Sequence, residues 1–312
     1  MIALRNLLFF SLLLFCCSTC KEDIPAVSFQ TKHVVIIIID GPRWTETWGE
    51  PTRQFIPGRV SLMQQGVMLT NFRNEGYTYT NAGHTAMTTG YHMPINNSGQ
   101  ELPLEPGIFQ YFRKAKSKPA DKVWLVASKD KLHILTDCQN TNWQGQYRPS
   151  FDVGVGGPAT GYRTDSVTHA HALNVLATHH PDLMMISYRE PDVTGHQNDW
   201  PGYLQQIRIT DQYVTEVWNA LQNDPYYAGT TTLFVTNDHG RHLDNVSGGF
   251  GSHGDACEGC RKIELLAIGP DFKRNVVSDI YADQRDIART TAYLLGFPME
   301  TGQGRVLEML FR

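Results

Sequence analysis

The sequence predicts an α/β protein of three layers, in which helices cover both faces of a mainly parallel central sheet. Five short stretches are mainly apolar without polar alternation, which is typical of strands that are buried on both faces. Longer stretches between them carry apolar residues at helical spacing, and strands that alternate with helices favour a parallel sheet. The predicted strands are residues 34–39, 123–127, 183–187, 232–236 and 263–268.

The predicted helices follow from apolar residues that recur three and four positions apart and so share one helix face. They cover residues 166–178, 203–222, 286–295 and, as a short C-terminal helix, 305–311. Residues 140–164 are rich in glycine, proline and polar residues. We expect that stretch to form a long loop near the site or an irregular insertion.

Composition indicates a globular protein with a sizeable core, because 41% of the 312 residues are hydrophobic and 19% are charged. The net charge of −4 gives no reason to expect a nucleic-acid-binding surface. No stretch rich in glycine, proline or serine divides residues 21–312, which we therefore predict to be a single domain.

The first 20 residues differ from the rest. Arg5 precedes an apolar stretch over residues 7–15, which is shorter than the roughly 20 residues that a membrane-spanning helix needs. This pattern predicts a signal peptide, and the cysteines that follow favour the bacterial lipoprotein type. Cys20 is the predicted lipidated residue, with Cys16 and Cys17 as alternatives, and an ordinary cleaved signal is the other interpretation. Both interpretations predict export, to the periplasm or cell envelope. Under the lipoprotein interpretation the protein contacts the membrane only through its lipid anchor.

Three cysteines remain, Cys138, Cys257 and Cys260. The Cys257-x-x-Cys260 pair could be half of a zinc knuckle, a redox pair or a disulfide. A structural zinc site usually needs a second such pair, which the sequence lacks. A redox pair should open a helix after a strand, whereas this pair precedes a predicted strand. In an oxidising compartment a disulfide is therefore the favoured interpretation, between Cys257 and Cys260 or between Cys138 and one of them.

Metal-ligand side chains follow three of the predicted strands. Asp40 ends the first, Asp192 and His196 follow the third, and the Asp238-His239 pair follows the fourth. Ligands of open α/β sheets bind at the carboxyl rim of the strands, and residues four apart share one face of a helical turn. His253 lies in a glycine-rich loop further on. We predict a metal site with more than one ion, although each residue alone could be a turn cap or an exposed polar group.

The segment around Thr80 supplies a hydroxyl. Thr80 or Asn81 is a predicted helix N-cap, and the small residues Ala82, Gly83 and Ala86 would allow close packing. A helix N-terminus is a favourable anion site, and two cations nearby would turn the Thr80 hydroxyl into a nucleophile. Without the metal ligands, Thr80 would be interpreted as a cap only.

These motifs occur in a recognisable order. The stretches VVIIIIDGPR, TYTNAGHTAMTTG, SYREPDVTGHQ, LFVTNDHG and GSHGD run from about residue 33 to about residue 255. Their order resembles that of the alkaline phosphatase superfamily, most closely its nucleotide pyrophosphatase/phosphodiesterase-like branch. The resemblance implies two divalent metal ions, usually zinc, with manganese as an alternative. It implies that one ion is held by Asp192, His196 and His253, and the other by Asp40, Asp238 and His239 with the Thr80 oxygen.

The resemblance further implies a hydrolase that cleaves phosphate mono- or diesters of small molecules through a covalent phosphothreonine at Thr80. Asn96 and Asn97 lie near the position of a family asparagine that touches a phosphate oxygen, although the usual His-Gly pair is missing there. The Cys/Ser-x-Pro-x-Arg context of sulfatases is absent, and the chain is too short for the mutase branch with its large inserted domain.

The sequence leaves the choice between monoester and diester open. Arg43, Arg189 and Arg241 each lie within three residues of a predicted ligand and could bind phosphate or form salt bridges to ligand carboxylates. Alternatives to the phosphoester hydrolase are a sulfate or phosphonate ester hydrolase on the same site, and a non-catalytic metal-binding surface lipoprotein. The oligomeric state cannot be predicted.

Overall fold

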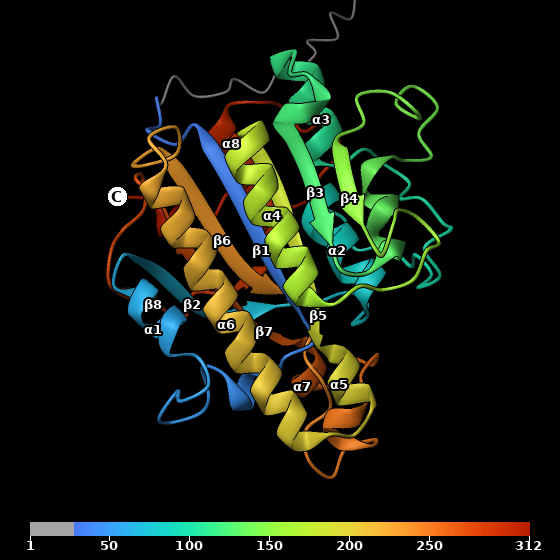
Figure 1. Ribbon diagram of the computed structural model, residues 1–312, viewed down its shortest axis with the longest axis vertical. Helices are drawn as coiled ribbons and strands as arrows, with labels where there is room; N and C mark the ends of the chain where they lie inside the picture. Colours follow the sequence, from blue (N-terminus) through green and yellow to red (C-terminus); the bar gives the residue numbers. More distant parts are fainter. Residues whose placement is uncertain (1–27) are drawn as a thin grey trace, which may run out of the picture.

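A nine-stranded sheet runs through the centre of the molecule (Figure 1), in the order β4-β3-β5-β1-β6-β7-β2-β8, with β9 paired to β2. The structure is a computed structural model that describes residues 28–312. The predicted signal peptide and Cys20 therefore lie outside the described residues. The strands are β1 His33–Asp40, β2 Gly66–Arg73, β3 Val123–Ala127, β4 Ser150–Val153, β5 Leu183–Pro191, β6 Thr231–Asn237, β7 Lys262–Ile268, β8 Val276–Ser278 and β9 Ala282–Asp283.

The sheet is mainly parallel, as predicted. β1 lies between β5 and β6 and pairs with both in parallel register. The antiparallel strand is β7, which lies between β6 and β2. All eight residues of β1 are buried, which is why its sequence is a continuous apolar run rather than an alternating one.

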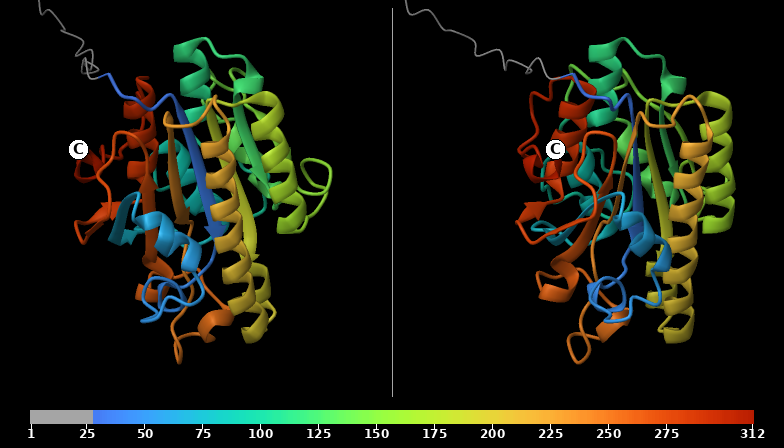
Figure 2. Two further views of the ribbon diagram at one scale, coloured as in Figure 1. Left: turned by 60° about the vertical axis from the view of Figure 1, so that its left-hand side comes forward. Right: turned by 90° about the vertical axis from the view of Figure 1, so that its left-hand side faces the viewer.

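Helices cover both faces of the sheet and so complete the predicted three layers (Figure 2). The alternation of β1 side chains divides the core in two. Val34, Ile36 and Ile38 pack in one cluster with α2, α3 and α8, whereas Val35, Ile37 and Ile39 pack in the other with α1, α4 and α6. The helices are α1 Pro57–Met63, α2 Thr80–Thr89, α3 Ile108–Lys116, α4 Asp165–His179, α5 Asp192–His196, α6 Trp200–Asn223, α7 Glu258–Arg261 and α8 Arg285–Leu295.

All five predicted strands and the three long predicted helices are confirmed, with ends that shift by up to four residues. The sequence did not predict β2, whose apolar run is interrupted by Thr70 and Asn71, or the short strands β4, β8 and β9. The predicted C-terminal helix over 305–311 is wrong. Only the 3₁₀ turn Glu308–Leu310 forms there, because Phe311 instead makes a β-bridge to Phe272.

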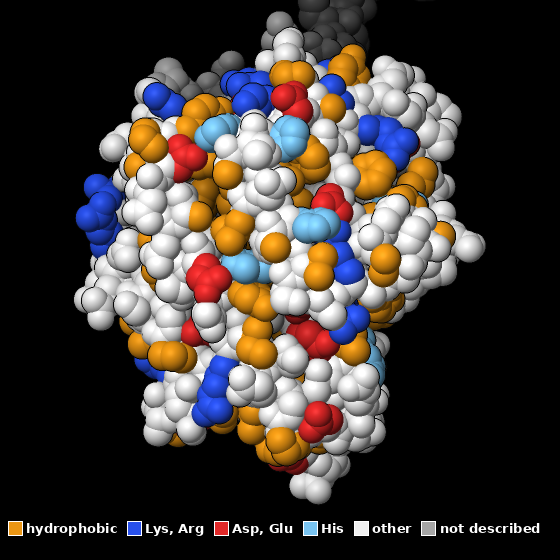
Figure 3. All heavy atoms as spheres, in the orientation of Figure 1, with side chains coloured by type: hydrophobic (Ala, Val, Ile, Leu, Met, Phe, Trp, Pro, Cys, Tyr) orange, Lys and Arg blue, Asp and Glu red, His pale blue; other side chains and the backbone are white. Residues whose placement is uncertain are grey.

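The surface carries mixed charge on the face shown in Figure 3, where basic and acidic side chains are scattered and neither sign forms a continuous patch. In residues 28–312 no helix combines the length and the apolar character needed to cross a membrane. Cys138, Cys257 and Cys260 are all free thiols. The disulfide that the sequence favoured is therefore not formed in this structure.

Candidate active site

Three strand ends bring the predicted ligands to one rim of the sheet. In the parallel register Asp40 lies opposite Pro191 of β5, and Ile39 lies opposite Asn237 of β6. Asp192 directly follows Pro191 and Asp238 directly follows Asn237. The three carboxylates therefore meet at the carboxyl ends of three adjacent strands, and all three are buried.

Asp192, His196 and His253 converge on one point. The α5 turn places His196 Nε2 3.2 Å from Asp192 Oδ1, as the four-residue spacing predicts. The long loop after β6 returns to bring His253 Nε2 to 3.3 Å from the same oxygen. The two imidazoles also meet directly, with 3.0 Å between their Nε2 atoms.

The protonation of these two imidazoles fits a bound cation. Nδ1 of His196 lies 3.1 Å from the carbonyl oxygen of Gly251, and Nδ1 of His253 lies 2.8 Å from that of Thr78. A carbonyl can only accept, so each Nδ1 carries a proton, and Nε2 is the ring atom that each histidine turns toward Asp192. Two imidazole Nε2 atoms and a carboxylate oxygen at this separation are a donor set that fits a divalent cation.

Asp40, Asp238 and His239 form an adjoining group of fully buried side chains. His239 Nε2 lies 3.5 Å from Asp40 Oδ1 and 3.5 Å from Asp238 Oδ2, and none of these three atoms makes a hydrogen bond. Buried polar atoms without partners cost free energy, and such a set of oxygen and nitrogen donors is what a divalent metal ion satisfies.

His239 connects the two groups, since it lies within ligand reach of both Asp40–Asp238 and Asp192–His253. Its ring stacks on that of His253 with centroids 3.9 Å apart. Burial lowers the pKa of His239 to about 3, so the imidazole is neutral at ordinary pH, which is the form that binds a metal. The residues predicted as metal ligands are thus brought together, and they fit a pair of ions.

Thr80 opens α2, with Tyr79 rather than Thr80 or Asn81 as the N-cap. The predicted close packing is confirmed at Gly83, where a Cβ would lie 2.5 Å from the carbonyl oxygen of Asp238. In the first turn of the helix, the backbone N–H of Asn81 donates to Asn97 Oδ1 at 3.1 Å. That amide is therefore not free to bind a substrate oxygen.

Lys129 is the residue that the sequence prediction missed. It lies two residues after β3, and its buried ammonium is 2.7 Å from both Asp40 Oδ2 and Asp192 Oδ2. It also donates to Thr80 Oγ1 at 3.2 Å. Burial alone would lower the pKa of Lys129, but the carboxylates of Asp192 and Asp40 outweigh it and raise that pKa above its ordinary value. The available signal was its position, at the end of a predicted strand.

A cleft of about 400 Å³ opens over Thr80 and is lined by Lys129, Asp192, His196 and His253. Its remaining lining residues are Asn97, Lys131, Tyr162, Val193 and Gln197. Tyr162 comes from the stretch over 140–164, which confirms the expectation that this stretch lies near the site. Lys131 donates to Asn97 Oδ1 at 2.9 Å. The side chains of Asn97, Lys129 and Lys131 thus line the cleft together with Thr80.

Two predicted substrate contacts are not brought into the cleft. Asn96 turns its side chain to the amide and hydroxyl of Ser98 within its own loop. Arg189, in β5, has its Nε 3.4 Å from Glu190 Oε1, a neighbour that holds the guanidinium beside the strand end. Arg241 forms a buried salt bridge to Asp192, as the alternative of a salt bridge to a predicted ligand carboxylate anticipated for that arginine.

Comparison with known proteins was made with this geometry in hand. No curated protein matches the chain in sequence. Residues 105–242 match the family described as type I phosphodiesterase / nucleotide pyrophosphatase. The match covers less than half of the 312 residues and supports the predicted place in the phosphodiesterase-like branch of the alkaline phosphatase superfamily. The matched segment contains Lys129 and the ligands Asp192, His196, Asp238 and His239, whereas Asp40, Thr80 and His253 lie outside it.

Solved structures of this superfamily share the fold. Murine ectonucleotide pyrophosphatase / phosphodiesterase 5 is 16% identical, with a TM-score of 0.63 over 89% of this chain and 100% of that one. A phosphonate monoester hydrolase from Silicibacter pomeroyi is 15% identical, with a TM-score of 0.64 over 89% and 76%. A sulfatase from Pseudoalteromonas sp. is 15% identical, with a TM-score of 0.65 over 90% and 72%. The family match and the shared fold support a hydrolase of phosphoesters or related sulfate esters.

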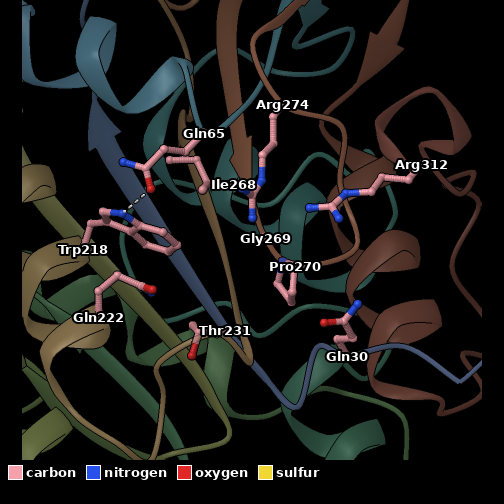
Figure 4. Close-up of a pocket in the computed structure, with 11 residues that line it drawn as sticks. Gln30, Gln65, Trp218, Gln222, Thr231, Ile268, Gly269, Pro270, Arg274 and Arg312 are labelled. Carbon is pink, nitrogen blue, oxygen red and sulfur yellow. Dashed lines mark hydrogen bonds between the residues drawn. The ribbon is translucent and has the colours of Figure 1, made fainter.

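A second pocket lies at the opposite end of the sheet, where β6 begins and β7 ends (Figure 4). Gln65, Trp218, Arg274 and Arg312 are among the residues that line it, and Trp218 Nε1 donates to Gln65 Oε1 at 3.2 Å. None of its lining residues is an acid, a histidine or a cysteine. In this phosphodiesterase-like protein the metal-ligand chemistry therefore belongs to the carboxyl rim.

Proposed function

We propose that the protein is an exported hydrolase that holds two divalent metal ions and cleaves phosphate esters through Thr80. The observation that supports this most directly is the convergence at Thr80. Its hydroxyl lies beside Lys129, which in turn touches Asp40 and Asp192, one carboxylate from each proposed metal site. A nucleophile, a cation and the metal ligands thus share one cleft.

The two proposed ions would be held by Asp192, His196 and His253, and by Asp40, Asp238 and His239, with zinc suited to the donor set. When bound, such a pair supplies positive charge that favours an ionised nucleophile and stabilises charge developing on the ester oxygens. The imidazole nitrogens and orphaned buried oxygens described above support this assignment.

The reaction we propose has two displacements at phosphorus. In the first, Thr80 Oγ1 gives up its hydroxyl proton and forms a bond to phosphorus, and the bond to the ester oxygen breaks. That oxygen leaves with the electron pair and takes up a proton. In the second, the oxygen of a water molecule bonds to phosphorus, the bond to Oγ1 breaks, and Thr80 recovers a proton. Lys129 is placed to donate to Oγ1 throughout, which favours the alkoxide over the hydroxyl.

The cleft favours a phosphate monoester over a diester. A monoester carries two negative charges on its terminal oxygens, and Lys129 and Lys131 both line the cleft. Because Asn97 Oδ1 already accepts from Asn81 and Lys131, its amino group is the part left to donate to a substrate oxygen. These three donors match a dianionic group better than a diester with one charge.

A second candidate is a sulfate or phosphonate ester hydrolase on the same site, favoured by the shared fold with a sulfatase and a phosphonate monoester hydrolase. Against the sulfatase, the sequence lacks the Cys/Ser-x-Pro-x-Arg context of its modified nucleophile. Export, to the periplasm or cell envelope with a lipid on Cys20, remains our proposal from the sequence, as does a small-molecule substrate.

The deciding experiment compares substrates on the purified mature chain loaded with zinc. We expect an aryl phosphate to be hydrolysed faster than a bis-aryl phosphate, an aryl phosphonate monoester or an aryl sulfate. Faster turnover of the sulfate would transfer the proposal to the second candidate. No turnover of any of the four, with both proposed catalytic ions bound, would leave a metal-binding protein without this activity.

A further inference from the structure

A second cluster of metal-ligand side chains lies outside the active site. It consists of His242, Asp255, Cys257 and Cys260, and we call it the cysteine cluster. Each residue offers one ligand atom, and the four atoms all lie within 4.8 Å of one another. None of them belongs to the proposed catalytic ligands. The sequence prediction sought a second Cys-x-x-Cys pair as partner for Cys257 and Cys260, but the partners are a histidine and an aspartate upstream.

Secondary structure brings these four residues together at the two ends of one loop. His242 lies just after β6, whereas Cys257 caps α7 and Cys260 lies within it, directly before β7. β6 and β7 are adjacent in the sheet. Gly240 N donates to the carbonyl oxygen of Cys260 at 2.8 Å, and a Cβ on Gly240 would lie 2.0 Å from the carbonyl oxygen of Gly259. The loop ends are thus held at backbone contact distance.

His242 is poised as a ligand rather than as a hydrogen-bonding residue. It is 4% exposed, and its Nδ1 lies 2.8 Å from the carbonyl oxygen of Ser247. Because that carbonyl can only accept, Nδ1 carries a proton, and Nε2 is the ring atom that faces the cluster. Nε2 is buried and makes no hydrogen bond, although Asp255 Oδ2 is only 3.2 Å away. His196, His239 and His253 have the same arrangement, with Nδ1 on a backbone carbonyl.

The other three residues complete a donor set of four atoms. Cys260 is fully buried and Cys257 is half-buried, and both are free thiols. Asp255 is fixed through Oδ1, which accepts from Cys257 N at 2.9 Å, so that Oδ2 remains for the cluster. Two sulfurs, one imidazole nitrogen and one carboxylate oxygen are a closed four-ligand set of the kind that structural zinc prefers over calcium or magnesium.

We propose that His242, Asp255, Cys257 and Cys260 bind a structural zinc ion, separate from the catalytic pair. The ion would close the loop that carries His253. In that loop His242 N donates to the carbonyl oxygen of Ser252 at 3.0 Å, and Thr78 Oγ1 donates to that of Asp255 at 2.7 Å. His253 itself donates to the carbonyl oxygen of Thr78. The zinc would therefore anchor a catalytic ligand from both sides, and thiolate binding would protect the two cysteines from oxidation.

X-ray absorption at the zinc edge tests this, because the proposed catalytic ligands contain no sulfur. Zinc bound to them gives no zinc–sulfur scattering, so the result does not depend on whether the proposed function is correct. The full chain is produced with zinc in the medium and purified without chelator or reductant. We expect zinc–sulfur scattering at about 2.3 Å. Absence of that scattering, or a Cys257–Cys260 disulfide in mass spectra of unreduced peptides, would overturn the proposal even if no variant folds.

A pair of variants locates the signal. Cys257→Ser should lose the sulfur scattering and one equivalent of bound zinc per chain. Cys138→Ser is the matched control, because Cys138 is buried in the hydrophobic core away from the cluster, and it should keep both. Equal zinc content and equal sulfur scattering in Cys257→Ser and the unmutated chain would contradict the assignment.

Discussion

The Nζ atom of Lys129 lies 3.2 Å from Oγ1 of Thr80, in a buried site where the same ammonium bridges two carboxylates. The contact joins β3 to the first residue of α2, two elements far apart in the sequence. It gives the hydroxyl a charged donor, and it places a positive charge beside the oxygens of any group that Thr80 attacks. This contact is the reason we propose a part in the reaction for Lys129, a residue that lies in no recognised sequence motif.

Replacing Thr80 by alanine should abolish turnover while both catalytic ions remain bound. Removing a nucleophile typically costs about a thousandfold or more in kcat. Steady-state kinetics on an aryl phosphate together with metal analysis check this. Thr80→Ser, which keeps the hydroxyl, is the control and should retain measurable activity. Near-normal activity in Thr80→Ala would show that another group attacks phosphorus.

Replacing Lys129 by methionine should lower kcat by about a hundredfold, the usual effect of losing one charged donor to a transition state. Metal content should not fall, because the ammonium shares Asp40 and Asp192 with the ions rather than helping to bind them. The metal-free variant should instead be destabilised by about 3–5 kcal/mol, since two buried carboxylates lose their cation. Unchanged kcat with reduced metal content would assign Lys129 a purely structural role.

The convergence of the proposed ligands could be predicted because it follows from local sequence and sheet geometry together. Asp40, Asp192 and Asp238 each follow a mainly apolar run, and parallel strands bring such ends to one rim. The same reasoning could not find Lys129, since lysines at strand ends are common and its pairing depends on how β3 lies in the sheet. The order of the motifs along the chain added one inference that their spacing could not provide, namely that Thr80 is the hydroxyl proposed for the site.

The cysteine cluster was not predictable for a related reason. Its four residues are recruited from both ends of a loop, and only the pairing of β6 with β7 brings His242 to Cys260. Asn97 shows the same limit on a smaller scale. Sequence placed it near the phosphate, but its contact with Asn81 N depends on how the chain returns to α2 after Gly90.

Substrate binding should weaken as pH rises through about 8. Burial, and then repulsion from Lys129, lower the pKa of Lys131 to about 8. Below that pH the ammonium is charged and can bind an anionic ester, whereas above it the charge is lost. Loss of one charge-assisted contact of about 1.5 kcal/mol or more should raise KM about tenfold. Lys131→Met should show the raised KM at every pH. If KM still rose near pH 8 in this variant, a group other than Lys131 would cause the rise.

Chelation should remove activity, and added zinc should restore it. Without ions, Asp40 Oδ1, Asp238 Oδ2 and His239 Nε2 are buried without hydrogen bonds, which costs free energy in the folded state. An ion present at about a thousand times its dissociation constant stabilises the fold by about 4 kcal/mol. The melting temperature should therefore fall on chelation and rise again with zinc. Full activity at metal contents below two ions per chain would contradict the two-ion proposal.

Gly83 should be as sensitive as a catalytic residue although it bears no chemistry. A Cβ there would lie 2.5 Å from the carbonyl oxygen and 2.9 Å from the Cβ of Asp238, so Gly83→Ala must push α2 away from β6. Thr80 sits at the end of that helix, and a shift of about 1 Å in a reacting group can cost about a hundredfold in rate. Overpacking should also cost about 1–3 kcal/mol in the free energy of unfolding.

The control for that substitution is Gly156→Ala, because a Cβ on Gly156 meets no atom within 4 Å. It should change neither kcat/KM nor the melting temperature. Kinetics and thermal unfolding of the two variants, measured side by side, separate a displaced Thr80 from a general intolerance of alanine. If Gly83→Ala kept full activity, the contact between α2 and Asp238 would not be what positions the nucleophile.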